Sequence, residues 1–484
     1  MPCFTVWQNC AVEGTCSSVE RLRLRPADRL VYSTEASYMY LLYSALLSIY
    51  FLGRLPAIAY ASWKYRKPLG SVRERLGRLP DGVNPDHVSS IWIHAVSVGE
   101  ALAVRPLVRS LRAVYTDHRL VLSTTTVTGQ QVARQFGDEL DAVFYAPFDF
   151  IPMVTRALDR IAPELLIVVD TEIWPNLLRA CRRRGVRTML VNGRLSDRSF
   201  RGYRLVRPFM RQVLDHIDQI CVQTEQWAQR FVDLGADAAR VTVTGSMKFD
   251  AVSISATSAR HHVADHALRL FEFAKTRPVF IAASTLRGEE EPVLRAFGRM
   301  RETAPNTLLV LAPRHPDRFA EARTCAEAAG YQVHLRSDLN PGGAPEAAIV
   351  LLDTMGELGR LFQIASTVFI GGSLVPAGGH NLLEPAAFGK AIVVGPHMEN
   401  FAEVTEQFVS QQAAVQVRSE AELEATLVDL MHDSVRRASL GAAALALVDA
   451  HRGATQRSMD VAAELLPPGT RSATGATPTL RVVE

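Results

Sequence analysis

An acidic side chain stands where a parallel α/β sheet would place a catalytic group. Glu100 follows an expected strand over Ile91–Val96, directly after a glycine at the turn from strand to helix. Near the amino end of a helix, the helix dipole favours the ionised form of a carboxylate. An ionised carboxylate can accept the proton of an attacking hydroxyl group. Glu100 is therefore a candidate general base, and N-terminal capping of the helix is the alternative.

Three further polar motifs follow expected strands of the same half of the chain. Asp170 and Glu172 come after an apolar stretch, and capping of a helix that starts near Pro175 explains one of these acids but not easily both. Arg194 is a candidate contact for an anion, or else a member of a surface ion pair. Lys248 is a compact cation for a phosphate or a carboxylate, or else a solvated surface group. All of these residues fall on the side of the sheet where α/β proteins bind ligands.

A glycine-rich stretch, FIGGSLVPAGGHNLLEPAAFGKAIVVGP, is the strongest ligand-binding motif of the chain. The sequence predicts a strand at Thr367–Ile370, a loop with two glycine pairs, a helix over 382–388 and a strand at Ala391–Val394. Glycines let the backbone approach a ligand closely, and such loops present N–H groups to a phosphate. Asn381 is expected to cap the helix and Glu384 to accept hydrogen bonds from ribose hydroxyls.

Other expected strand ends in the second half carry polar groups as well. Ser284 and Thr285 end its first strand, Arg314 follows the next, and Met355–Glu357 follow another. Arginine can hold a phosphate through two hydrogen bonds, and backbone groups at Met355–Glu357 can contact a base or a ribose. Several such groups at one edge of a sheet favour a single site over unrelated surface positions.

Composition limits the classes of protein that fit. A chain of 484 residues, 48% of them hydrophobic, suits two domains with well-filled cores. A formal net charge of only +3 argues against a dedicated nucleic-acid binder. The cysteines form neither a C-x-x-C pair nor a cluster with histidine at zinc spacing, which predicts a cytosol-facing protein without a disulfide framework or a metal site. They are Cys3, Cys10, Cys16, Cys181, Cys221 and Cys325.

An apolar segment near the N-terminus predicts contact with a membrane. Residues 1–37 show no period and are therefore expected to be disordered; Met39 could also serve as a start, which would make residues 1–38 an extension. Residues 38–63 are apolar apart from interruptions that include Arg54 and Pro56, and a bilayer takes about 20 apolar residues to span. They are expected to form a kinked span or an interfacial helix, with a buried core helix as the alternative. The basic and aromatic residues around 63–78 suit the cytoplasmic side.

The remainder alternates between strands and helices, which is the rhythm of parallel sheets covered on both faces. We expect two Rossmann-like domains over 64–250 and 277–466, joined by a linker over 251–276 and followed by a disordered tail over 467–484. The strands expected besides those already given are Leu120–Ser123, Ala142–Tyr145, Leu165–Val169, Thr188–Val191, Gln219–Val222, Val241–Val243, Val279–Ala283, Thr307–Ala312, Gln332–Leu335, Ala348–Leu352 and Ala413–Val417.

The ordered motifs between Leu76 and Phe401 resemble the 3-deoxy-D-manno-octulosonic acid (Kdo) transferases of bacterial lipopolysaccharide synthesis. The matching stretches are IWIHAVSVGE, STTTVTGQ, YAPFDF, TEIWPN, NGRLSDRSFRGY, TGSMKFD, APRHPDRF, DTMGELG and GGSLVPAGGHNLLEPAAFGK. The resemblance implies the GT-B fold, in which two Rossmann-like domains face a cleft. It also implies transfer of Kdo from CMP-Kdo to a lipid A precursor at the cytoplasmic face of the inner membrane. No cofactor is expected, and because the sequence shows no cluster of metal ligands, protein groups alone are expected to handle the phosphate charge.

The resemblance also implies roles for individual residues. Glu100 would be the general base, and Asp170 and Lys248 would stabilise the transition state. The residues implied to bind CMP are Pro313, Arg314, Met355, Gly356, Glu357, Asn381, Leu382, Leu383 and Glu384. A direct displacement would invert the anomeric centre.

Two departures and three alternatives accompany this interpretation. The family usually has Glu at the position of Asp170, and often has His-Glu where Leu286 and Arg287 stand. One alternative is a GT-B transferase or epimerase that uses another nucleotide sugar. A dinucleotide-dependent oxidoreductase is disfavoured because no G-x-G-x-x-G follows the first strand of either half. A membrane-bound binding protein without activity would not explain the polar residues after the strands of both halves.

Overall fold

The structure, a computed structural model, describes residues 34–65, 72–251, 277–339 and 347–468. It divides into two compact units, Met1–Leu55 and Pro56–Glu484. The boundary falls inside helix α1 (Thr34–Tyr65), which contains the predicted anchor 38–63 and continues through Pro56. Across the described ranges, no helix combines the length and the apolar character needed to cross a bilayer. The predicted extension and tail, and nearly all of the predicted linker, lie outside the described residues.

The first half of the larger unit is built on a parallel sheet of seven strands in the order β3-β2-β1-β4-β5-β6-β7. Most of the strand residues are buried, as expected for a sheet covered on both faces. The strands are β1 (Ser90–His94), β2 (Arg119–Thr124), β3 (Ala142–Tyr145), β4 (Pro163–Val169), β5 (Arg187–Gly193), β6 (Gln219–Val222) and β7 (Val241–Val243).

The helices of this half start where the sequence supplies caps. The side chains of Ser97, Thr126, Ser196 and Thr224 each accept a backbone N–H of the first helical turn, and this contact stabilises a helix start. The helices are α2 (Val72–Arg75), α3 (Val98–Val114), α4 (Val127–Arg134), α5 (Ile151–Ile161), α6 (Pro175–Arg184), α7 (Asp197–Leu205), α8 (Arg207–Leu214) and α9 (Glu225–Asp233).

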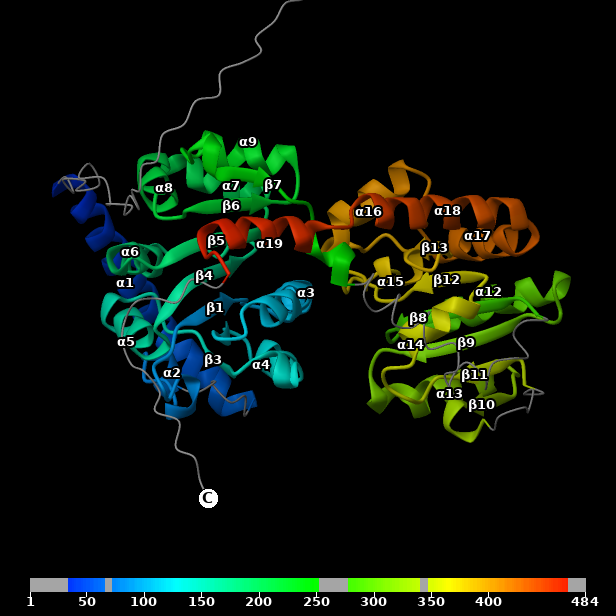
Figure 1. Cartoon of the computed structure of the whole chain (residues 1–484). Helices are drawn as coiled ribbons and strands as arrows, with labels where there is room; N and C mark the ends of the chain where they lie inside the picture. Colours follow the sequence, from blue (N-terminus) through cyan, green and yellow to red (C-terminus); the bar gives the residue numbers. More distant parts are fainter. Residues whose placement is uncertain (1–33, 66–71, 252–276, 340–346, 469–484) are drawn as a thin grey trace, which may run out of the picture. The chain divides into compact units, whose positions relative to one another are not determined.

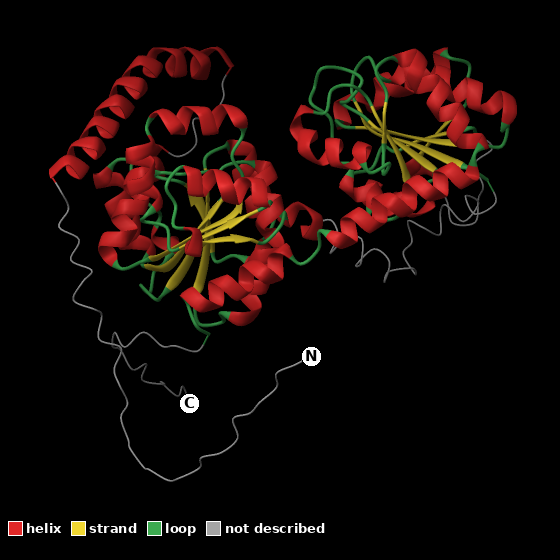
Figure 2. Cartoon of the chain, turned by 90° about the horizontal axis from the view of Figure 1, so that it is seen from above, coloured by secondary structure: helices red, strands yellow, loops and turns green. Residues whose placement is uncertain are grey.

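The second half repeats this architecture, and Figure 2 shows helices on both faces of each sheet. Its strand order is β10-β11-β9-β8-β12-β13-β14, again all parallel. The strands are β8 (Val279–Thr285), β9 (Leu308–Pro313), β10 (Val333–Leu335), β11 (Ile349–Leu351), β12 (Thr367–Ile370), β13 (Ala391–Val394) and β14 (Val415–Gln416). The helices are α12 (Glu290–Thr303), α13 (Phe319–Ala328), α14 (Leu358–Leu361), α15 (Leu383–Ala386), α16 (Ala402–Ser410), α17 (Glu420–His432) and α18 (Ser434–Ala450).

The last helix, α19 (Ala454–Leu465), belongs to the core of the first half, which corrects the expected second domain over 277–466. Ala454, Met459 and Ala462 are buried in the same cluster as β1 and α3, and Figure 1 shows α19 beside β5. Asp250 fixes the start of this helix, since its carboxylate accepts the backbone N–H groups of Gly453 and Thr455 at 2.8 and 2.6 Å. A short amphipathic helix carries no sequence signal for the sheet on which it packs.

The strand order of each sheet reverses once, and the reversals locate the ligand-binding edges. In the first sheet β1 lies between β2 and β4, and in the second β8 lies between β9 and β12. The connections that follow β1 and β4 therefore lie on opposite faces of the first sheet, and those that follow β8 and β12 lie on opposite faces of the second. Side chains that follow these strands surround a crevice at the carboxyl edge, where open α/β sheets bind ligands.

Candidate active site

Glu100 lies in the first turn of α3, after β1, and closes a capping box. Its carboxylate accepts the backbone N–H of Val96 at 2.7 Å and the hydroxyl of Ser97 at 2.8 Å. Ser97 in turn accepts the backbone N–H of Glu100 at 3.4 Å. The capping role considered as the alternative is therefore present in the structure.

The surroundings of Glu100 also suit proton transfer. Burial, and then the nearby charge of Asp170, raise the pKa of Glu100 to about 7. Hydrogen bonds from Ser97 and Val96 act in the opposite direction but do not cancel the effect of burial. A carboxyl group with a pKa near neutrality is matched to general-base work, so capping and proton transfer are compatible in this residue.

Asp170 follows β4 on the other side of the strand-order reversal. Its backbone adopts the left-handed region, with φ of 60°, and the residue is 7% exposed. Its carboxylate accepts hydrogen bonds from the side-chain amide of Asn192 and, at 3.2 Å, from Nε of Arg194. A buried non-glycine residue in this region is a strained position of the kind that collects at functional sites.

The second predicted acid, Glu172, faces an aromatic pair. Its carboxylate accepts Nε1 of Trp174 at 3.0 Å, and the Trp174 ring meets the buried His94 ring at a centroid distance of 4.5 Å. Burial raises the pKa of Glu172, and the charge of Asp170 adds to that effect. Capping was expected to explain only one of the two acids, and neither carboxylate caps a helix in these contacts.

Lys248, in the segment after β7, shares the electrostatic environment of the two acids. Burial, followed by the charge of Arg194, lowers the pKa of Lys248, whereas Asp170 and Glu100 act to raise it. Glu100, Asp170 and Lys248 therefore lie close enough to influence one another. The structure brings together the three residues that the resemblance implied for catalysis.

The glycine loop after β12 differs from the expectation that its N–H groups are presented to a phosphate. The N–H groups of Gly372, Ser373 and Leu374 donate to the carboxylate of Glu289 at 2.7, 3.1 and 2.9 Å. The same carboxylate accepts the N–H of Leu286 at 2.8 Å. Glu289 is fully buried, so an internal carboxylate occupies this anion-binding turn. The first glycine pair therefore shapes the loop, and the phosphate of a ligand must accept its hydrogen bonds from other groups.

Close packing explains why this loop is rich in glycine. Gly371 and Gly372 are followed by a second pair, and three of the four have positive φ. A Cβ on Gly371 would lie 2.4 Å from the carbonyl oxygen of Ser284, and one on Gly372 would lie 2.9 Å from the His380 ring. The loop therefore packs on the end of β8 and on His380. Burial, and then the charge of Arg314, lower the pKa of His380 to about 4.

The residues expected to bind a nucleotide gather at the carboxyl edge of the second sheet. One cavity has Pro313, Arg314, Met355, Asn381 and Glu384 in its lining. The prediction that Asn381 caps the helix is wrong, because α15 begins at Leu383 with Leu382 in the cap position and no side-chain cap. The Asn381 side chain instead accepts the N–H of Leu383 at 3.1 Å in the turn that leads into the helix. Its amide nitrogen donates to Glu384 at 3.1 Å. Burial raises the pKa of Glu384, and Asn381 and Arg314 counteract this.

Three of the residues expected to bind the nucleotide have side chains that are buried or already hydrogen-bonded within the protein. The side chains of Leu382 and Leu383 are buried in the core, which leaves their backbone groups for any contact. The Glu357 carboxylate is held by Nη2 of Arg336 at 2.8 Å and by the Thr354 hydroxyl at 2.7 Å. Gly356, with φ of 83°, makes the turn beside it.

Two functional candidates in the structure are not evident from the sequence. Glu289 was not singled out, although it heads the acidic run EEE at the start of α12; such a run suggests helix capping. Asn192 was noted only as part of the motif around Arg194. The Leu286–Arg287 departure matters less than expected, since Leu286 contributes a backbone N–H and Arg287 pairs with the exposed Glu321 at 2.8 Å.

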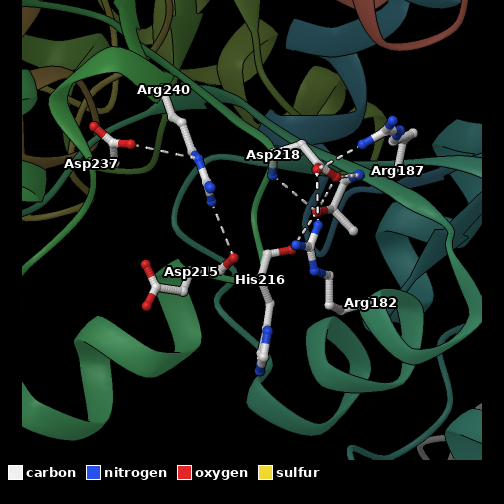
Figure 3. Close-up of polar contacts among 8 residues, drawn as sticks. Arg182, Arg187, Asp215, His216, Asp218, Asp237 and Arg240 are labelled. Atoms are coloured by element: carbon white, nitrogen blue, oxygen red, sulfur yellow. Dashed lines mark hydrogen bonds and ion pairs between the residues drawn. The ribbon is translucent and has the colours of Figure 1, made fainter. Parts of the chain in front are cut away.

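A second charged cluster lies away from the carboxyl edge of the first sheet. Figure 3 shows Asp218, which precedes β6, facing Arg182 and Arg187 at 3.5 and 3.3 Å. Burial, and then the charge of Arg182, lower the pKa of His216 to about 4. Because Arg187 begins β5, this cluster joins the amino ends of two strands. We assign it to the stability of that edge, not to ligand binding.

Comparisons with known proteins agree with the geometry. Residues 70–251 match the family model described as 3-Deoxy-D-manno-octulosonic-acid transferase (kdotransferase). The chain is 33% identical to the 3-deoxy-D-manno-octulosonic acid transferase of Haemophilus influenzae, covering 86% of this chain and 94% of the relative. It is also 33% identical to the enzyme of that name from Bordetella pertussis, covering 84% and 96%.

A solved structure supports the fold. The UDP-GlcNAc 2-epimerase of Neisseria meningitidis aligns with a TM-score of 0.53 at 13% identity, covering 78% of this chain and 99% of the epimerase. At that identity the likeness shows only the two-domain α/β architecture. The sequence relatives go further: the chain belongs to the 3-deoxy-D-manno-octulosonic acid transferase family and is a Kdo transferase.

Proposed function

We propose that this Kdo transferase moves Kdo from CMP-Kdo to the lipid A precursor lipid IVA, by a direct displacement that inverts the anomeric centre. The observation that carries the proposal is the group Glu100, Asp170 and Lys248 at the edge of the first sheet, with the Glu100 pKa raised to about 7. A base of this kind is what a sugar hydroxyl needs in order to attack. The corresponding edge of the second sheet carries the candidate nucleotide contacts.

In this proposal Glu100 takes the proton of the acceptor hydroxyl while that oxygen forms the new bond to the anomeric carbon of Kdo. The bond from that carbon to the CMP phosphate breaks, and its electron pair leaves with CMP. Lys248 supports the negative charge that grows during the displacement, because a fixed cation in a partly buried site requires no reorganisation at that moment. Asp170 accepts a hydrogen bond from Arg194. Its negative charge acts to raise the pKa of both Glu100 and Lys248.

CMP would be held by the second half. Arg314 supplies a guanidinium group for the phosphate, and Pro313 lies beside it in the cavity lining. Backbone groups of Met355–Glu357 and of Asn381–Leu383 would contact the base and the ribose. Glu384 would accept the ribose hydroxyls from its place next to Asn381.

We further propose that α1 anchors the enzyme at the inner membrane, with both sheets on the cytoplasmic face. Large apolar side chains on this helix are exposed, namely Tyr38, Leu41, Leu42, Leu46, Ile49, Tyr50 and Leu52. The basic residues that follow in the sequence, including Lys64, Arg66 and Lys67, would meet anionic headgroups. Exposed apolar area next to basic residues suits a helix bound at the interface.

The direct test of the proposed function is incubation of purified protein with lipid IVA and freshly generated CMP-Kdo, followed by mass spectrometry of the lipid. One or more added Kdo masses are expected, and their number gives the units transferred. Competition by CMP but not by UDP would separate the proposed donor from other nucleotide sugars. No added mass, with a positive-control enzyme active on the same reagents, would refute this donor and acceptor pair.

The rate of transfer should depend on pH through Glu100. A base works only when deprotonated, so kcat/KM should rise as pH increases through about 7 and level off above it. A glutamate with the usual pKa of 4.5 would give this limb at a much lower pH. The measurement is a pH–rate profile from pH 5 to 9 at constant ionic strength. A profile that is flat between pH 5.5 and 8 would contradict the assignment of Glu100 as the base.

A further inference from the structure

Asn192 occupies an irregular position at the end of β5. The register between β5 and β6 shifts between Leu190 and Gly193, and Asn192 has a left-handed backbone with φ of 56°. The residue is fully buried. A bulge re-aims a side chain at the end of a strand, and bulges are frequent beside active sites. Asparagine is one of the few residues other than glycine that are enriched in this backbone region.

The side-chain amide of Asn192 bonds both to Asp170 and to the segment that carries Lys248. Its amide nitrogen donates to the carboxylate of Asp170, and its amide oxygen accepts the backbone N–H of Met247 at 3.1 Å. Met247 directly precedes Lys248. The carbonyl oxygen of Asn192 accepts Nε2 of Gln223 at 2.9 Å, which fixes the bulge to the loop after β6.

These contacts join two residues that the chain separates widely. Asp170 follows β4, and Lys248 lies in the segment after β7, so no backbone element of the sheet links them directly. A single planar amide fixes the distance and the direction between its two partners. It also adds no charge to a place where Arg194 already pairs with Asp170 at 3.2 Å.

We propose that Asn192 is a positioning residue for Kdo transfer: its side-chain amide orients the Asp170 carboxylate and fixes the segment that carries Lys248. This inference rests on the proposed function, because it assigns the two partners their roles in the displacement. Asn192 itself touches no reacting atom. Loss of the amide should therefore misplace both groups while CMP, held by the other sheet, still binds.

The test compares Asn192→Gly with a matched variant, Asn84→Gly. Glycine keeps the left-handed backbone at 192 and removes both side-chain contacts without adding charge. Asn84 is equally buried, and its amide nitrogen donates to the carbonyl oxygens of Val88 and Ile161 at 2.8 and 2.9 Å, before β1 and away from the site. Both variants should lose similar thermal stability, which is checked by melting curves.

For Asn192→Gly we expect kcat to fall about 100-fold, with the KM for CMP-Kdo near its wild-type value, whereas Asn84→Gly should keep kcat. A second readout needs no turnover. Labelling of Lys248 by an amine-selective reagent, followed by peptide mass spectrometry, should be faster in Asn192→Gly than in wild type and unchanged in Asn84→Gly.

The two readouts separate failure of this inference from failure of the proposed function. If wild-type protein transfers no Kdo, the proposed function fails, while the labelling rates still decide whether Asn192 fixes the Lys248 segment. Unchanged kcat and unchanged labelling in Asn192→Gly would overturn the positioning role. Equal losses of kcat in both variants would show that Asn192 contributes only to folding.

Discussion

Replacing Glu100 with alanine is expected to abolish Kdo transfer while CMP binding stays nearly intact. The carboxylate lies after β1, beside Asp170, and the nucleotide contacts lie on the other sheet. Without the base, the acceptor hydroxyl keeps its proton, and general-base catalysis contributes about 10²- to 10⁴-fold. Turnover is measured with saturating CMP-Kdo, and CMP affinity by calorimetry. Preserved turnover would contradict the assignment.

The capping role of Glu100 requires a matched control. Ser97→Ala removes the other half of the capping box, since Ser97 accepts the Glu100 N–H and donates to its carboxylate, but it leaves the base in place. Loss of such a cap costs about 0.5–2 kcal/mol of stability. If both variants melt at similar temperatures and only Glu100→Ala loses transfer, catalysis and capping are separated. Equal loss of transfer in both would assign the effect to the helix start.

The strands were the part of the fold that the sequence predicted best. Each predicted strand corresponds to an observed one. The limits of β3, β6, β7, β12 and β13 match, and the ends of the others shift by a residue or two. Apolar runs bounded by polar turns define parallel strands locally, because such strands are buried on both faces. The positions of Glu100, Asp170 and Lys248 at strand ends followed from the same pattern.

The sequence could not predict contacts between residues that lie far apart along the chain. Glu289 is 83 residues from Gly372, and nothing near either residue shows that the carboxylate occupies the turn of the glycine loop. The packing of α19 on the first sheet depends on shape complementarity with β1 and α3, which the sequence of a short helix does not encode locally. The bulge at Asn192 is similar, because the register shift is a property of two strands together.

The loop after β12 should lose its shape when Glu289 is replaced by glutamine. The carboxylate accepts four backbone N–H groups, from Leu286 and from residues 372–374. An amide keeps one oxygen acceptor and turns an NH₂ group toward the remaining N–H donors. Each buried donor left without a partner costs about 1–3 kcal/mol, and a domain has only about 5–15 kcal/mol in total. We expect a large fall in melting temperature and much weaker CMP binding.

Glu290→Gln provides the comparison, because Glu290 is the adjacent buried acid but is held by Arg318 at 2.7 and 3.1 Å, and not by the loop. It should also lower the melting temperature, since it removes the charge of a buried ion pair. The loop after β12 keeps its Glu289 contacts in that variant, so CMP affinity, measured by calorimetry below both melting temperatures, should stay close to wild type. Equal CMP affinity in the two variants would mean that the Glu289 contacts stabilise the fold without shaping the nucleotide site. Weaker binding in Glu289→Gln alone would show that an internal carboxylate, placed where a phosphate was expected, organises the loop that leads to the nucleotide contacts at Asn381 and Glu384.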